Sequence, residues 1–143
     1  MAKREEAKFS QILRLLIMGA GGHFSRVEAH ASADGIPDVD YCLDGTEGHL
    51  ELKVGHSTKD PELRGSQFRW FKNRADAGGK PMVLLQDSDT GDVMVYFFRH
   101  LHGLKGRKTM IKWREKAFLT FTAEEFDSEE FLIFLTSFED IPQ

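Results

Sequence analysis

The chain has 143 residues, enough for one ordinary domain with a real hydrophobic core but not for two. Hydrophobic residues make up 41% and charged residues 29%, and no apolar run approaches the ~18 residues of a membrane span, which argues against a membrane protein. The net charge of −4 argues against indiscriminate attraction to nucleic acid, whose phosphates supply most non-specific affinity.

Residues 4–19 carry apolar side chains at helical spacing and predict an N-terminal helix. The first six residues lack the apolar core and cleavage site of a secretory signal, so we expect a cytoplasmic protein of a bacterium or of a phage-infected cell. Gly19, Gly21 and Gly22 are expected to end the helix. These glycines follow a helix, whereas a phosphate-binding loop precedes one, and we interpret them as a turn.

The next segment is rich in strand signals. Residues 23–31 are expected to form a strand that leads into a turn at residues 32–35. Two further strands are predicted at residues 36–43 and 49–54. The turn-rich residues 44–48 lie between them and would close a hairpin.

After the hairpin, Ser66 is a candidate N-cap for a helix that carries Phe68, Phe71 and Ala75 and ends at Gly78-Gly79. A continuous apolar run at residues 82–85 predicts a buried strand. The turn-forming residues 87–92 then lead into a second strand at residues 93–98. Strands that alternate with helices in this way predict an α/β domain with a central mixed sheet flanked by helices.

The last part of the chain carries two candidate capping boxes, Thr122 with Glu125 and Asp127 with Glu130. A final helix is expected to bury four apolar side chains in the core or in a dimer seam: Phe131, Phe134, Leu135 and Phe138. We expect one domain over residues 1–143, with a core at about residues 5–98 and a basic segment and helical tail at residues 99–143. The sequence alone does not predict the fold of that tail.

Charge is unevenly distributed in the tail. Residues 99–116 contain seven Lys or Arg and one Glu, whereas residues 124–140 contain seven acidic residues and no basic one. This polarity predicts a basic segment that meets DNA phosphates and an acidic end that faces elsewhere. Five cations are candidate DNA contacts: Lys105, Arg107 and Lys108 in the basic segment, and Arg69 and Lys72 on the predicted helix. A solvated surface is the alternative for both groups.

The most informative motif joins Gly35-Ile36-Pro37-Asp38 to Glu51-Leu52-Lys53. Because side chains alternate along a strand, Glu51 and Lys53 share one face while the apolar residues at 50, 52 and 54 occupy the other. The hairpin would bring Asp38 beside them. An exposed sheet face with a surface ion pair is the alternative interpretation.

Two carboxylates and an amine are the groups that a magnesium-dependent phosphodiesterase requires. Mg²⁺ is usually held by one or two carboxylates together with waters and substrate phosphate oxygens. The ion polarises the scissile phosphate and acidifies water. Lys53 would add a compact positive charge where negative charge develops.

These residues, followed by Ser66-Gln67-Phe68-Arg69-Trp70, resemble the PD-(D/E)XK nuclease superfamily, and within it the VRR-NUC and archaeal Holliday-junction-resolvase-like branches. The resemblance covers about residues 5–86. It implies a restriction-endonuclease-like α/β core, Mg²⁺ as cofactor with Mn²⁺ as a substitute, DNA as partner and a homodimer.

The resemblance also implies roles for single residues. Asp38 and Glu51 would be metal ligands and catalytic, Lys53 the catalytic lysine, and Gln67 a cleft-lining residue of the site. It further implies an acidic residue on the first helix, for which we prefer Glu6. Glu5 is the alternative on that helix, and Glu28 on the preceding strand is another.

Other polar residues carry weaker signals. His100 and His102 could form a zinc site only with further ligands that the sequence does not supply nearby. His49 and His56 flank the Glu51–Lys53 strand and could contact phosphate, although partly exposed strand-end histidines are the simpler expectation. Asp40 could be an outer metal ligand or a solvated strand residue. Cys42, the single cysteine, excludes an internal disulfide, and we expect a buried, inert thiol.

The sequence therefore predicts a Mg²⁺-dependent DNA endonuclease, most consistent with cleavage of branched or junction DNA. A sequence-specific homing or restriction-like endonuclease is the alternative within the enzymes. A non-catalytic DNA-binding module that has kept the fold is the alternative outside them. The clustered Asp, Glu and Lys disfavour that last alternative, because a module without catalysis has no need for them.

Overall fold

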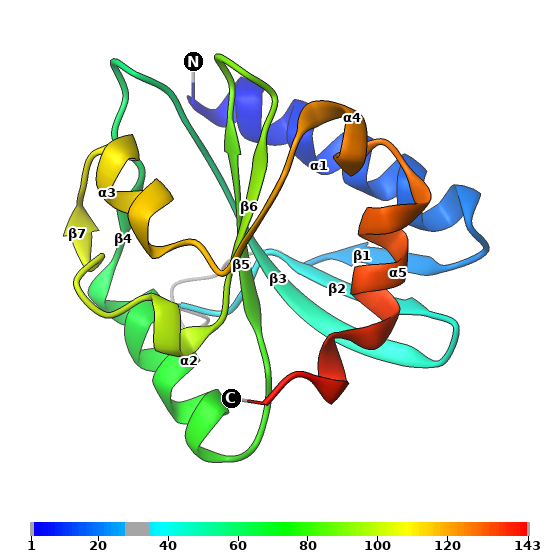
Figure 1. Cartoon of the computed structure of the whole chain (residues 1–143). Coiled ribbons are helices and arrows are strands. Elements are labelled where there is room, and N and C mark those ends of the chain that lie inside the picture. Colours follow the sequence, from blue (N-terminus) through cyan, green and yellow to red (C-terminus); the bar gives the residue numbers. More distant parts are fainter. Residues whose placement is uncertain (1, 28–34, 143) are drawn as a thin grey trace.

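A six-stranded mixed sheet forms the middle layer of the structure, a computed structural model that describes residues 2–27 and 35–142 (Figure 1). All neighbouring strands are antiparallel except the central pair β3 and β5, which are parallel and joined by a helical crossover. The spatial order is β1 (His23–Arg26), β2 (Val39–Leu43), β3 (Thr46–Gly55), β5 (Met82–Asp87), β6 (Val93–Tyr96) and β8 (Leu119–Phe121).

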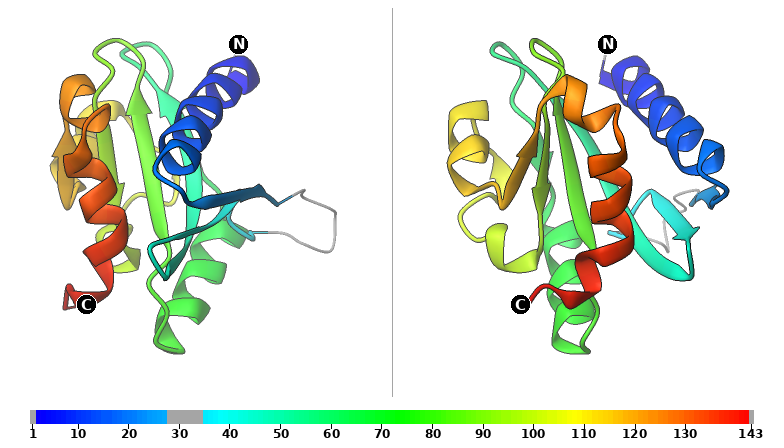
Figure 2. Two further views of the ribbon diagram at one scale, coloured as in Figure 1. Left: turned by 90° about the vertical axis from the view of Figure 1, so that its right-hand side faces the viewer. Right: turned by 45° about the vertical axis from the view of Figure 1, so that its right-hand side comes forward.

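Helices α1 (Ala2–Gly19), α4 (Ala123–Phe126) and α5 (Glu129–Ser137) cover one face of the sheet (Figure 2). The side chains of α1 at positions 9, 13 and 17 are fully buried, as the helical spacing predicts. The apolar residues of β3 at positions 50, 52 and 54 point into this core, which confirms the predicted alternation. The predicted buried stripe of the last helix is also confirmed, with its final residue in the short helix η3 (Phe138–Asp140).

The opposite face is covered by α2 (Gly65–Asp76), α3 (Met110–Lys116) and a two-stranded sheet of β4 (Glu62–Leu63) and β7 (Gly106–Arg107). A single turn, η2 (Phe98–His100), connects β6 to this layer. The core here includes Phe71, Leu85 and Trp113. Glu51 and Lys53 point toward this layer, and their charged groups are therefore enclosed by protein and not left on an open sheet face.

Several element boundaries differ from the predictions. Helix α2 has Arg64 as its N-cap and begins at Gly65, not after Ser66, because the side chain of Gln67 accepts a hydrogen bond from the Arg64 backbone N–H (3.0 Å). A glutamine at the third helical position can cap a helix in this way without a serine. The predicted strand at residues 23–31 ends at Arg26, and residues 28–34 lie outside the described part of the chain.

The turn of the motif hairpin is shorter than predicted. Asp44 and Gly45, both with positive φ, make the reversal, and Thr46 already belongs to β3. Strand β6 ends at Tyr96, two residues earlier than expected. The Thr122–Glu125 capping box is confirmed, but the final helix is capped by Ser128 and not by Asp127.

The tail folds back onto the core. Residues 106–107 pair with β4, and Leu119–Phe121 completes the sheet as β8. Among the described residues, no helix is long and apolar enough to cross a membrane.

Candidate active site

The site forms where β2 separates from β3. Their pairing ends at Val39 opposite Leu50, while β3 continues to Gly55 and pairs there only with β5. At this point the Oδ2 of Asp38 accepts a hydrogen bond from the Leu52 backbone N–H at 3.2 Å. The carboxylate thus takes the place of a missing strand partner and is fixed against β3.

A cleft of about 440 Å³ opens at this split edge. It collects residues from α1, the start of β2, β3, the segment around β4, α2 and β7. All five residues that the sequence singles out for the metal and the catalytic centre line it: Glu6, Asp38, Glu51, Lys53 and Gln67. The structure therefore brings them together, whatever their roles.

Gln67 connects the charged pair. Its Nε2 donates to Glu51 Oε2 at 2.9 Å, and its Oε1 accepts from Lys53 Nζ at 3.0 Å. The same Oε1 accepts from the Arg64 N–H, which fixes the orientation of the amide. Lys53 Nζ also donates to the Glu62 carbonyl at 2.6 Å and lies 3.8 Å from Glu51 Oε2. The lysine and the glutamate are thus held by a network and are only 8% and 4% exposed.

Burial and crowding dominate the electrostatics of Glu51. The pKa of Glu51 is raised to about 8: burial is the largest cause, the charge of Lys53 opposes it, and the carboxylates of Asp38 and Glu6 add to the rise. Its Oε1 is buried and has no hydrogen-bond partner. Such an atom is costly unless another group or an ion satisfies it.

Burial also lowers the pKa of Lys53, although the carboxylates around it act in the opposite direction. An ammonium with a lowered pKa loses its proton more readily than a surface lysine does. Lys53 therefore places a positive charge at the cleft and loses its proton more readily than a surface lysine does.

The preferred acidic residue of the first helix, Glu6, is half-buried and lines the cleft. Burial, followed by the charge of Asp38, raises the pKa of its carboxyl. Glu5 does not line the cleft, and its buried Oε2 has no hydrogen-bond partner. Glu28 lies outside the described residues. The geometry therefore places Glu6, and not Glu5, beside Asp38.

The structure adds cleft residues that the sequence analysis missed. Lys59, Asp60, Glu62 and Arg64 line the wall formed by the segment between β3 and α2. Their only sequence signal is a charged stretch directly after the motif strand. Their position depends on β4 folding over the sheet, and no local pattern predicts that.

Of the five predicted DNA contacts, Arg107 lines the cleft. Strand β7 pairs with β4 and thereby brings a guanidinium nitrogen of Arg107 to 3.4 Å from Glu62 Oε1. The other four lie outside the cleft. Lys105 lies over the Phe68 ring at 5.5 Å, and Lys72 pairs with Asp76 at 2.7 Å. Arg69 is exposed on α2, and Lys108 is partly exposed.

The weaker candidates have ordinary surroundings. Asp40 is exposed on β2, and Cys42 is partly exposed and not buried as expected. Nδ1 of His56 accepts from the Thr58 N–H at 3.3 Å. Nδ1 of His100 accepts from the Phe97 N–H at 3.1 Å, and burial lowers the pKa of that ring. His102 lies against the Phe98 ring at 4.9 Å, so it and His100 have separate partners.

Over residues 2–27 and 35–142, no group of three or more His, Cys, Asp or Glu is arranged to hold a metal ion by itself. Mg²⁺ does not require such a group, since it is commonly held by one or two carboxylates with waters and phosphate oxygens. Asp38 and Glu51 fit this donor set. A divalent cation would satisfy the Oε1 of Glu51 and relieve the mutual crowding of the carboxylates.

Comparison with known proteins finds a similarity of fold but no similarity of sequence to a family model or a curated protein. No model of a protein family matches the sequence, and no curated protein matches it. The fold is similar to Hjc from Archaeoglobus fulgidus, a Holliday junction resolvase of an archaeal hyperthermophile, with a TM-score of 0.55 and 15% sequence identity. The match covers 85% of this chain and 99% of the resolvase chain. It confirms the predicted fold class, a mixed sheet flanked by helices, and agrees with the superfamily resemblance at the level of the fold.

Proposed function

We propose that the protein is a Mg²⁺-dependent DNA endonuclease that cleaves branched or junction DNA. The observation that carries the proposal is the network in which Gln67 joins Glu51 to Lys53 beside Asp38, inside one cleft. Burying two charged side chains without a ligand to bind is costly for stability. Their retention in a cleft is therefore better explained by chemistry than by folding.

Asp38 and Glu51 would hold the ion, with Glu6 as an additional carboxylate at the edge of the site. When bound, Mg²⁺ would supply Lewis-acid polarisation of the phosphate and acidify water near it. Lys53 stabilises the negative charge that develops on the phosphate oxygens, from a position fixed by Gln67 and the Glu62 carbonyl. Gln67 keeps the carboxylate and the ammonium at a set separation.

The rim of the cleft provides the docking charges. Lys59, Arg64 and Arg107 line it from the β4 and β7 side. Guanidinium and ammonium groups at these positions suit the phosphates on either side of the bond to be cut. The remaining basic segment would extend this contact along the DNA.

We further propose that the active form is a homodimer, since a symmetric four-way junction presents two equivalent strands. Helix α1 carries three large apolar side chains that are exposed in one copy: Ile12, Leu15 and Met18. A second copy of the chain would bury these side chains in a dimer interface. Light scattering across a dilution series measures the mass in solution, and a monomer at every concentration would contradict this part of the proposal.

The test of the activity uses purified protein with a panel of linear, flapped, four-way and supercoiled DNAs, each with Mg²⁺ or with EDTA. We expect Mg²⁺-dependent cleavage near the branch of the flapped or four-way DNA and none in EDTA. Cleavage at one fixed sequence in the linear DNA would favour the sequence-specific alternative. Binding without cleavage of any DNA would favour the non-catalytic module.

A further inference from the structure

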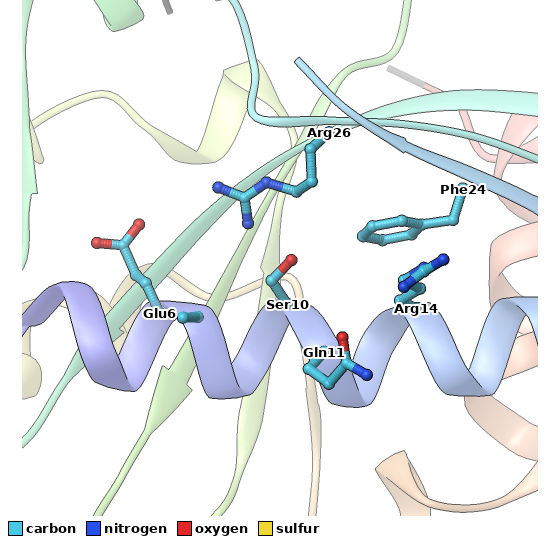
Figure 3. A pocket seen from close by; sticks show the side chains of 7 residues that line it. Glu6, Ser10, Gln11, Arg14, Phe24 and Arg26 are labelled. Carbon is cyan, nitrogen blue, oxygen red and sulfur yellow. The ribbon is translucent and has the colours of Figure 1, made fainter. Parts of the chain in front are cut away.

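A second pocket lies beside the cleft, between α1 and β1 (Figure 3). Its volume is about 660 Å³, compared with about 440 Å³ for the cleft. Glu6 lines both spaces, so the pocket is next to the proposed metal site. The proposed catalytic residues other than Glu6 do not line it, and the proposed function therefore leaves it without a role.

Two arginines give the pocket a positive rim. Arg14 on α1 and Arg26 on β1 are both exposed, and within the described part of the chain neither forms a salt bridge. Figure 3 shows the guanidinium of Arg26 turned toward Glu6 and that of Arg14 turned toward Phe24. The charge of Arg26 acts on the Glu6 carboxyl without forming a salt bridge with it, so its donors stay available. Guanidinium groups of this kind, which line a pocket, are suited to bind phosphate with two parallel hydrogen bonds.

The walls offer both an aromatic ring and small polar groups. Phe24 is 8% exposed, so its ring is fixed by the core while part of it lines the pocket. The hydroxyl of Ser10 points into the space, and the residue is otherwise buried (Figure 3). Stacking on an aromatic ring and hydrogen bonds from small polar side chains are how proteins hold unpaired bases. The volume lies within the ~300–1,000 Å³ of typical small-ligand pockets.

We propose that this pocket binds an unpaired nucleotide of the DNA substrate, adjacent to the bond that is cut. Its phosphate would lie on Arg26, its base against Phe24, and the neighbouring phosphate on Arg14. The inference rests on the proposed nuclease function and adds the feature of the DNA that is recognised. A base inside a duplex is stacked and paired and does not reach such a pocket without being extruded. The pocket therefore selects DNA that already carries unpaired nucleotides, such as a flap or an open junction.

The test compares two DNAs with the same duplex, one blunt and one with a short single-stranded tail. Affinity is measured by fluorescence anisotropy with Ca²⁺ in place of Mg²⁺, and cleavage is measured separately with Mg²⁺. Ala7 is exposed and lines the pocket, so Ala7→Trp should fill it from the surface without altering the core. Arg26→Ala removes one phosphate contact. Lys8 is exposed on the same helix outside the pocket, and Lys8→Trp and Lys8→Ala are the matched controls.

We expect the parent protein to bind the tailed DNA about tenfold more tightly than the blunt DNA, the effect of one charge-assisted contact. Ala7→Trp and Arg26→Ala should each remove most of this preference, and both Lys8 variants should keep it. The inference is wrong if Ala7→Trp keeps the preference, or if Arg26→Ala weakens the binding of both DNAs equally. Cleavage of both DNAs without a preference for the tail would overturn only the proposed role of the pocket, whereas failure to cut any DNA would overturn the proposed function. Melting curves show whether Ala7→Trp still folds. If it does not, Arg26→Ala decides the test, because this substitution changes only an exposed side chain.

Discussion

The side-chain amide of Gln67 donates a hydrogen bond to the carboxylate of Glu51 over 2.9 Å in the buried part of the cleft. A neutral amide therefore stands between a carboxylate and an ammonium and contacts both. Because its oxygen is already fixed by Lys53 and the Arg64 N–H, the amide has one satisfactory orientation. The geometry of the proposed catalytic pair depends on this residue although it carries no charge.

Removing the amide should slow catalysis. We expect Gln67→Ala to reduce cleavage roughly 10- to 100-fold, the usual effect of losing a residue that orients metal ligands. The half-saturating Mg²⁺ concentration should rise, because Glu51 would lose its positioning contact. Single-turnover cleavage over a Mg²⁺ series measures both quantities.

Asn73 provides the control for this prediction, since it is an exposed amide on the same helix and does not line the cleft. Asn73→Ala should cleave with the parent rate and the parent Mg²⁺ dependence. If Gln67→Ala also behaves as the parent protein does, the amide does not position the catalytic pair.

Neutralising either proposed metal ligand should abolish cleavage and leave the fold intact. Asp38→Asn and Glu51→Gln each remove one carboxylate but keep an oxygen for the hydrogen bonds that Asp38 and Glu51 accept. Without metal, both variants should melt at a higher temperature than the parent protein, because crowding among the carboxylates is relieved. Cleavage at the parent rate by either variant would show that the metal is held elsewhere.

The raised pKa of Glu51 predicts how stability depends on pH. In the metal-free folded protein this pKa is about 8, compared with 4.5 for an ordinary glutamate, so between these values the folded state holds a proton that the unfolded state has lost. The free energy of unfolding should therefore fall as pH rises from 4.5 toward 8, by at most about 1.4 kcal/mol per pH unit from this group. Urea denaturation at several pH values measures the slope.

Glu51→Gln is the matched comparison, because it cannot ionise and should flatten most of that slope. Glu6, whose pKa is also raised, would leave a smaller slope in the same direction. Saturating Mg²⁺ should likewise flatten the dependence in the parent protein, since the ion favours the ionised carboxylates. An unchanged slope in Glu51→Gln would assign the pH dependence to other groups.

The central part of the fold and of the site was predictable because short-range rules govern it. Alternation along β3 places its apolar residues in the core and forces Glu51 and Lys53 onto the other face. The predicted hairpin brings Asp38 to Leu52, although the reversal at Asp44-Gly45 that sets this register is shorter than the predicted turn at residues 44–48. These relationships extend over fewer than 20 residues of chain, and local sequence patterns encode them.

The depth and the walls of the cleft were not predictable, because they depend on contacts between distant segments. Arg107 reaches the cleft only because β7 pairs with β4, 45 residues earlier, and neither two-residue strand has a recognisable pattern. The pocket beside Arg26 likewise requires α1 to pack beside β1 at a particular angle. Tertiary packing sets that angle, and helical periodicity alone does not.

Lys53 should be required for the rate and not for binding. We expect Lys53→Ala to lose about 10²–10³ in cleavage rate while DNA and Mg²⁺ affinities stay near those of the parent protein. Lys53→Met should behave similarly, with a smaller effect on melting, because it keeps most of the buried volume. Lys59→Ala, which removes a cation at the cleft rim, should instead weaken binding and keep the rate at saturating DNA. Equal losses of rate and affinity in Lys53→Ala would make that residue a phosphate anchor.

The basic segment should determine the salt dependence of DNA binding. Replacing Lys105, Arg107 and Lys108 together by alanine should lower the slope of log affinity against log salt by roughly 2–3 units, about 0.9 for each phosphate contact. Cleavage at saturating DNA should persist, because only Arg107 reaches the cleft, and its position beside Glu62 is at the rim. Arg107→Ala alone removes only the contact at the cleft rim and leaves the two more distant lysines. It should lower the slope of log affinity against log salt by about one unit. Titrations at four or more salt concentrations give the slopes. An unchanged slope in the triple variant would mean that the DNA approaches the cleft over another surface, and the exposed cations of α1 would then be the next candidates.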